Sequence, residues 1–167
     1  MKRGLFIGRF QPFHDGHLSV LKKMHTLGYN EVIVGIGSSQ YSRTKKNPLS
    51  VNERIEIIKL VTSKHDDIPV IKLVEIPDIH NDDEWVDHVN KIVHSAVGDY
   101  ESIFTGNNWT ARLFNDKNYN VNQVNQSIDI SGSKIREQII TNNDNWKKFV
   151  DPEIIDKLKN AVRESTT

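Results

Sequence analysis

The sequence predicts an α/β fold in which helices cover both faces of a parallel sheet. Short apolar, β-branched runs alternate along the chain with segments whose apolar residues recur at helical spacing. The run at residues 31–37 is apolar almost throughout, which is typical of a strand buried on both faces. At 167 residues the chain is long enough to bury such a core, so we expect one domain over residues 1–167.

The first strand–helix–strand unit has the clearest boundaries. An apolar run predicts a strand over residues 5–8, and a helical pattern follows over residues 16–27. Gly28 stands just beyond this pattern, where a C-cap glycine ends many helices. The β-branched run at residues 31–37 is the next strand.

The second unit begins after a polar loop. Ser50 and Glu53 are spaced as a capping box, so we expect a helix from here to residue 61. The apolar run at residues 70–76 is the third strand, and Pro77 closes it because proline cannot continue a sheet ladder.

Shorter segments complete the prediction. Helices are expected over residues 83–97, 109–114, 133–140 and 152–162, and strands over residues 102–105 and, more weakly, 121–124. The tail at residues 163–167 is expected to be flexible, as chain ends often are. Together the elements predict a Rossmann-like, doubly wound parallel sheet with C-terminal helices.

Composition excludes several classes of protein. Basic and acidic residues balance at 22 each, so no overall field favours nucleic acid or a membrane surface. The chain has no cysteine and therefore no disulfide or thiol chemistry. It contains neither a signal-peptide pattern nor an apolar run near 18 residues, which favours a soluble, cytoplasmic protein.

The stretch at residues 8–17, GRFQPFHDGH, is the most informative part of the sequence. It joins a predicted strand to a helix start, where unpaired N–H groups and the helix dipole favour an anion. His14 and His17 are three residues apart and can face the same side, while Gly16 permits close backbone approach. Arg9 adds a guanidinium fork suited to phosphate oxygens. A phosphate site is predicted here; a zinc site is the weaker alternative, because structural zinc normally needs four ligands.

A second motif, ISGSKIR, occupies residues 130–136. Ser131 and Ser133 would supply hydroxyl and backbone N–H groups at a helix start, and Arg136 lies one turn further on. A capped helix with a solvated arginine is the structural alternative. The turn at residues 8–17 follows the first strand, residues 35–38 end the second, Asp78 follows the third and Gly106 ends the fourth. All four should meet at one edge of the sheet, where ligands bind in doubly wound folds.

Both motifs resemble those of the nucleotidyltransferase superfamily, H-x-G-H and I-S-x-(S/T)-x-I-R. The longer form G-R-F-Q-P-F-H-x-G-H resembles the archaeal-type nicotinamide-nucleotide adenylyltransferases, and the resemblance extends over residues 3–140. It implies transfer of AMP from ATP to nicotinamide mononucleotide (NMN), giving NAD and pyrophosphate. It also implies Mg²⁺ carried mainly by the ATP phosphates, with no metal ligand from the protein, and a homo-oligomer for which a hexamer is one form.

The resemblance also implies roles for individual residues. Catalytic roles fall on Arg9, His14, His17, Lys46 and Arg136, and binding roles on Gly8, Phe10, Gly16, Asp78, Trp85, Gly106, Asn107, Ile130, Ser131 and Ser133. Lys46 stands where the family usually has arginine, so Arg43 is an alternative. Trp85 is expected to stack on nicotinamide, with core packing as the alternative role of its ring.

Several alternatives remain at this point. The family often has asparagine where this chain has Asp82, which bears on the carboxamide contact, and Glu53 with Arg54 could be a structural pair. Nicotinate mononucleotide is an alternative acceptor. Adenylyltransferases for FMN or phosphopantetheine are the nearest rival enzymes. A non-catalytic NAD- or ATP-binding regulator would keep the pocket but would not need the cations.

Overall fold

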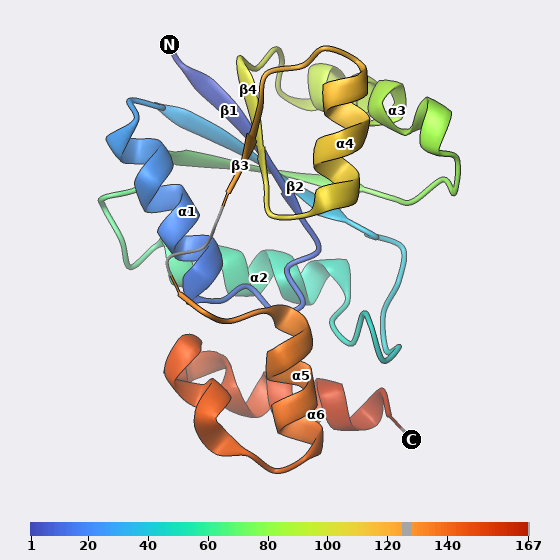
Figure 1. The fold of residues 1–167 in the computed structure, drawn as a ribbon. Coiled ribbons are helices and arrows are strands. Elements are labelled where there is room, and N and C mark those ends of the chain that lie inside the picture. The colour runs from blue at the N-terminus through green and yellow to red at the C-terminus, as the bar shows by residue number, and fades with distance from the viewer. Residues whose placement is uncertain (125–127, 167) are drawn as a thin grey trace.

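A five-stranded parallel sheet with the order β3-β2-β1-β4-β5 forms the centre of the fold (Figure 1). The strands are β1 (Arg3–Gly8), β2 (Glu31–Gly37), β3 (Val70–Ile76), β4 (Ser102–Thr105) and β5 (Val121–Gln123). From β1 the chain first adds strands on one side and then returns to add the others, so the predicted doubly wound sheet is confirmed. The computed structural model describes residues 1–124 and 128–166.

The helices cover both faces of this sheet. They are α1 (Asp15–Thr26), α2 (Val51–Thr62), α3 (Asp82–Ala96), α4 (Asn108–Asp116), α5 (Gly132–Ile140) and α6 (Ile155–Glu164), with short 3₁₀ helices η1 (Asp144–Phe149) and η2 (Pro152–Ile154). Helices α1 and α2 pack on one face and α3 and α4 on the other, while α5 and α6 extend the α2 side (Figure 1). In the part of the chain described here, no helix is both long and apolar enough to cross a membrane.

Two apolar clusters, one on each face, hold the layers together. Side chains alternate across a strand, so Leu5 and Ile7 of β1 join the cluster under α3 and α4, whereas Phe6 joins the one under α1 and α2. The cluster under α1 and α2 also contains residues of α5 and α6, so the C-terminal helices pack into the same core as the sheet. Strand β2 is buried along its length, as its apolar sequence predicts.

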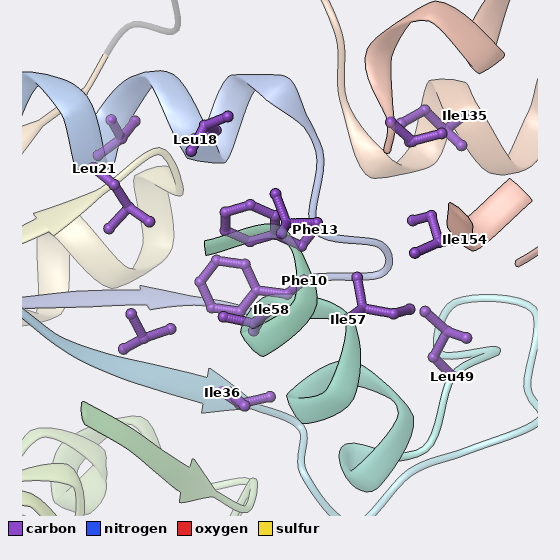
Figure 2. Close-up of a cluster of buried hydrophobic side chains, with 14 of the residues drawn as sticks. Phe10, Phe13, Leu18, Leu21, Ile36, Leu49, Ile57, Ile58, Ile135 and Ile154 are labelled. Carbon is purple, nitrogen blue, oxygen red and sulfur yellow. The ribbon is translucent and has the colours of Figure 1, made fainter. Parts of the chain in front are cut away.

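The turn between β1 and α1 is fixed to the core by two aromatic rings. Phe10 and Phe13 are each 2% exposed, and their ring centroids are 5.9 Å apart. They lie together beside Ile58 of α2, and Ile135 and Ile154 extend the cluster toward the C-terminal helices (Figure 2). The turn therefore rests on closely packed aromatic side chains.

Capping side chains set the helix boundaries. The predicted box at α2 is present, because Ser50 Oγ accepts from the Glu53 N–H (3.2 Å) and Glu53 Oε1 accepts from the Ser50 N–H (2.9 Å). Helices α3 and α4 each begin one residue earlier than predicted. Their N-caps are Asn81 and Asn107, whose side-chain oxygens accept from backbone N–H groups three residues on.

The C-terminal segment differs from the prediction in two places. A 3₁₀ helix over Asp144–Phe149 stands where only a turn was expected, and it buries Trp146 at 1% exposure. The predicted helix at residues 152–162 begins as a 3₁₀ turn and continues as α6 to Glu164. The flexibility expected of the tail stays a prediction, and its last residue, Thr167, lies outside the described residues.

Candidate functional site

A cavity of about 540 Å³ opens at the carboxyl ends of the strands. It lies where the strand order reverses, between the elements that follow β1, β2, β3 and β4. Most of the predicted site residues line it: Gly8, Arg9, Phe10, His17, Lys46, Asp78, Trp85, Asn107, Ser131, Ser133 and Arg136. Segments that are far apart in the sequence therefore meet at the predicted edge of the sheet.

Four predicted residues, His14, Gly16, Gly106 and Ile130, lie outside this lining. Ile130 is 5% exposed because it packs into the apolar cluster under α1 and α2. Gly106 precedes the cap of α4, and the backbone N–H of Gly16 is already engaged by His14. A direct ligand contact by these four residues stays a prediction.

The two histidines form an unusual capping box at the start of α1. His14 Nδ1 accepts from the Gly16 N–H (3.0 Å), and His17 Nδ1 accepts from the His14 N–H (3.1 Å). The imidazoles thus act as serine and glutamate do in the usual box. Their rings stack with centroids 3.8 Å apart, so they do face the same side, as predicted.

This box determines where each imidazole carries its proton. An Nδ1 atom that accepts a hydrogen bond is unprotonated, so the proton of each neutral ring is on Nε2. Burial lowers the pKa of His14 from its ordinary 6.5 to about 4. Burial, and then the neighbouring His14, lower the pKa of His17 well below the ordinary 6.5. Near pH 7 both rings are neutral Nε2–H donors, with His17 on the cavity wall and His14 buried behind it.

Three cationic side chains line the cavity: Arg9, Lys46 and Arg136. Among residues 1–124 and 128–166, none of the three forms an ion pair with a carboxylate. Burial, and then the charge of Arg9, lower the pKa of Arg136. Because these three cations are not paired with carboxylates, the side of the cavity that carries them has a positive potential suited to phosphate.

Lys46 and Arg43 occupy different environments. Lys46 is exposed on the cavity wall, whereas Arg43 forms a two-point pair with Glu53 (2.7 and 3.1 Å) and contacts Glu164 (3.2 Å). The hydrogen bond from Arg43 lowers the pKa of Glu53 to about 2. The sequence left open a structural pair of Glu53 with Arg54. That alternative is wrong, because the Glu53 carboxylate is paired with Arg43.

Arg54 instead holds the backbone behind the cavity. Its side chain is 0% exposed, and its Nη1 donates to the carbonyls of Arg9 (3.0 Å) and Gly37 (2.8 Å). Its Nη2 donates to the Ser38 carbonyl (3.2 Å). Burial lowers the pKa of Arg54 to about 10, so the guanidinium stays charged at neutral pH. It joins the turn after β1 to the end of β2.

Gln11 connects the same turn to two cation-bearing segments. Its side chain is 3% exposed and forms two hydrogen bonds of 2.9 Å with the N–H and C=O of Leu49. Leu49 lies three residues beyond Lys46. The backbone carbonyl of Gln11 accepts from Arg136 Nη1 (2.8 Å), so one residue contacts both segments.

Two indoles form the part of the cavity wall supplied by α3 and α4. Trp85 is 4% exposed and belongs to the apolar cluster under these helices, yet it also lines the cavity. Trp109, which the sequence reasoning did not select, is 37% exposed, and its ring centroid is 4.7 Å from that of Trp85. Its Nε1–H donates to Asp82 Oδ2 (3.2 Å). Core packing and a stacking surface are thus compatible roles for Trp85.

Comparison with known proteins agrees with this architecture. A family model described as cytidylyltransferase-like matches residues 5–138. The nicotinamide-nucleotide adenylyltransferase of Thermococcus sibiricus is 37% identical over 162 residues, which is 94% of this chain and 83% of that protein. The one of Methanococcus maripaludis is 36% identical over 157 residues, 92% of this chain and 86% of the relative. The chain belongs to the nicotinamide-nucleotide adenylyltransferase family.

A solved structure of this family's wider class shares the fold. A bifunctional NMN adenylyltransferase/ADP ribose pyrophosphatase from Francisella tularensis, complexed with AMP and a manganese ion, matches with a TM-score of 0.71 at 22% identity. The match covers 98% of this chain and 51% of that one, so this chain spans about half the length of that protein. At this identity the likeness shows the fold alone.

Sequence reasoning missed three residues of this adenylyltransferase-family site: Gln11, Arg54 and Trp109. A signal existed for Arg54, which lies at helical spacing from the buried Ile57, Ile58 and Val61 and so on the buried face of α2. Gln11 and Trp109 had no such signal, because their roles depend on partners 38 and 27 residues away.

Proposed function

We propose that this chain transfers an adenylyl group from ATP to NMN, with NAD and pyrophosphate as products. The observation that carries the proposal is one cavity with unpaired cations and a neutral imidazole on one side of the sheet and two indoles on the other. Such a cavity can bind polyphosphate beside the cations and a flat ring beside the indoles. The names of the archaeal relatives support the same reaction.

The reaction needs no protein nucleophile. An oxygen of the NMN phosphate attacks the α-phosphorus of ATP, and the bond from that phosphorus to the bridging oxygen of the β-phosphate breaks. The electron pair leaves with pyrophosphate, and no proton has to be removed from the attacking oxygen, which is already anionic at neutral pH. Catalysis then consists of alignment of the two phosphates and stabilisation of the charge on the leaving group.

The residues on the cavity wall have distinct roles in this proposal. His17 donates its Nε2–H to a phosphate oxygen, while His14 orients that ring through the shared cap. Arg9, Lys46 and Arg136 stabilise the negative charge of the triphosphate. The start of α5, where Ser131 Oγ accepts from the Lys134 N–H (3.1 Å), presents further backbone N–H groups beside Arg136.

The donor set fits Mg²⁺ as an ion carried by the nucleotide. Among the described residues no group of three histidine, aspartate or glutamate side chains could hold a metal, and the phosphate side of the cavity is cationic. Mg²⁺ prefers phosphate and water oxygens, and when bound it would offset the charge of the phosphates. The residues of this chain would bind the phosphates of that complex.

Incubation of the purified protein with ATP, Mg²⁺ and one acceptor at a time tests the proposal. We expect pyrophosphate and NAD with NMN, and little pyrophosphate with FMN or phosphopantetheine. Release of pyrophosphate with one of the latter acceptors and none with NMN would assign the chain another substrate. The same preparation, examined by light scattering, checks the expected homo-oligomer, which stays a prediction together with the cytoplasmic location.

A further inference from the structure

The guanidinium of Arg54 uses all five of its N–H donors on backbone carbonyls. Among residues 1–124 and 128–166 it forms no ion pair with a carboxylate. Peptide dipoles are therefore the groups that compensate this buried charge. The five acceptors are the carbonyl oxygens of Gly37 (2.8 Å), Arg9 (3.0 Å), Ser38 (3.2 Å), Ser50 (3.3 Å) and Tyr41 (3.4 Å).

Three of these carbonyls belong to residues that line the cavity. They are those of Arg9, Gly37 and Ser38, whereas Arg54 itself lies behind the lining. Strands β1 and β2 are neighbouring parallel strands, so the segments that follow them leave the sheet side by side. One side chain of α2 thus holds the two segments in a fixed relation to each other.

The direction of these carbonyls also determines the direction of two N–H groups. In a trans peptide the C=O and the N–H point to opposite sides, and the two peptides concerned are trans. The carbonyls of Arg9 and Gly37 point at Arg54, so the N–H groups of Phe10 and Ser38 point away from it. In the described part of the chain neither N–H has a hydrogen-bond partner, and both residues line the cavity.

The backbone at both N–H groups is strained. Phe10 has a φ of 55° and Ser38 a φ of 49°, in the left-handed region that residues with a side chain seldom adopt. Such a conformation persists where the surroundings hold it in place. A hydrogen bond from Arg54 to the carbonyl just before each residue is a contact of this kind.

We infer that Arg54 is a positioning residue for the proposed adenylyl transfer, in which its guanidinium keeps the N–H groups of Phe10 and Ser38 directed at the phosphates of ATP. The inference rests on the proposed function, because it requires a polyphosphate in the cavity. Two oriented backbone donors add to the cations of the wall without a side chain that has to be ordered. Arg54 touches no substrate and acts through the two strand ends.

The experiment compares Arg54→Lys and Arg54→Met with Val61→Ala. Lysine keeps the charge but lacks the planar fork that reaches both strand ends, and methionine removes charge and donors together. Val61 is another buried residue of α2, and it packs in the apolar cluster under α1 and α2. Its truncation weakens the packing of the same helix and leaves the five carbonyl contacts in place. Thermal unfolding sets a temperature at which each variant is folded.

We expect Arg54→Lys to lower kcat by at least about tenfold, and Arg54→Met by about 100-fold if it folds. KM for NMN should stay within about twofold, because the five contacts of Arg54 lie after β1, after β2 and before α2. Val61→Ala should lower the unfolding temperature and keep kcat within about twofold. Wild-type kcat in folded Arg54→Lys, or an equal fall of kcat in Val61→Ala, overturns the inference.

Binding of inorganic tripolyphosphate, measured by calorimetry, separates this inference from the proposed function. Its affinity should fall at least about tenfold in Arg54→Lys and stay near the wild-type value in Val61→Ala. If the wild type forms no NAD from NMN, the proposed function fails, and the same titration still decides whether Arg54 organises a phosphate site. Equal affinity in the wild type and Arg54→Lys overturns the inference even where NAD is formed.

Discussion

The Nε2 proton of His17 is the single group on which we expect turnover to depend most. His17→Ala removes a preorganised donor from the phosphate site and should lower kcat by about two to three orders of magnitude. Steady-state kinetics of the folded variant measure this. His25→Ala is the control, since His25 is exposed near the end of α1 and outside the cavity lining. Near wild-type activity of His17→Ala would remove His17 from the mechanism.

Lys46 is the cation whose family equivalent is usually arginine. Lys46→Ala should lower kcat because charge on the leaving group loses a partner, and Lys46→Arg should preserve or improve it because arginine adds a second donor. Arg43→Ala should leave kcat nearly unchanged, since Arg43 is engaged with Glu53 outside the cavity. Loss of turnover in Arg43→Ala with none in Lys46→Ala would reverse the assignment.

Trp85 has two roles that substitution can separate. Trp85→Ala should raise KM for NMN about 5- to 150-fold and leave KM for ATP nearly unchanged, because stacking on the ring is worth about 1–3 kcal/mol. The ring is also 4% exposed, so the same variant should lose about 3–5 kcal/mol of stability. Trp85→Phe should recover most of both losses. Normal NMN kinetics in a folded Trp85→Ala would show that acceptor recognition lies elsewhere, with Trp109 as the next candidate.

At the scale of elements, Gln11 determines how the turn after β1 meets the loop that carries Lys46. Gln11→Met has a similar volume but leaves the N–H and C=O of Leu49 without their partner, at about 1–3 kcal/mol for each buried group. We expect lower stability, a raised KM for ATP and an unchanged KM for NMN, since the aromatic wall is separate. Equal loss for both substrates would indicate a general effect on folding.

The elements themselves could be predicted because they depend on local pattern. Apolar periodicity gave the strands and helices, and the Ser50–Glu53 spacing gave a helix start that the structure confirms. The asparagine caps Asn81 and Asn107 were missed, although their side chains follow the same local rule. What local pattern cannot give is a contact such as Arg54 to the Gly37 carbonyl, which exists only after the helix docks on the sheet.

The candidate site also has a part that local pattern predicts and a part that it does not. Residues that lie in short motifs at strand ends were predictable as a group, since the carboxyl ends of parallel strands meet at one edge. The burial of individual site residues was not predictable: His14 and Ile130 lie in the predicted motifs, yet their side chains are buried and do not line the cavity. Exposure of a side chain depends on the packing of the whole molecule and not on its position in a motif.

For the whole molecule, the buried imidazoles predict a loss of stability in mild acid. Because the pKa of His14 is about 4 in the folded protein and near 6.5 when unfolded, the unfolded state binds more protons between these values. The contribution of the neutral His14 ring to the free energy of unfolding is complete above pH 6.5. It is lost as the pH falls toward 4, and the loss is roughly 3 kcal/mol for His14 alone. His17 acts in the same direction. Urea unfolding at pH 7, 6 and 5 measures the slope.

His14→Asn is the control for this pH dependence. Asparagine is a good N-cap residue and can accept from the Gly16 N–H, but it does not titrate. The variant should keep the helix start and show a shallower fall in stability between pH 6.5 and 4. Glu53, whose pKa is lowered to about 2, keeps its full contribution to stability above its ordinary pKa of 4.5 and loses it only below that value, so it accounts for little of the change between pH 6.5 and 4. An unchanged slope in His14→Asn would contradict burial of the neutral ring.

The shared cap of His14 and His17 has a consequence for how this family member can change. In many enzymes the functional groups weaken the scaffold, so that a substitution can gain stability as it loses activity. Here the Nδ1 atoms that close the first turn of α1 also fix the Nε2 proton of His17, which lines the cavity. A substitution that disorders the start of α1 should therefore also disturb the orientation of the His17 ring. Selection for a more stable α1 therefore also preserves the orientation of the His17 proton that we propose to bind phosphate.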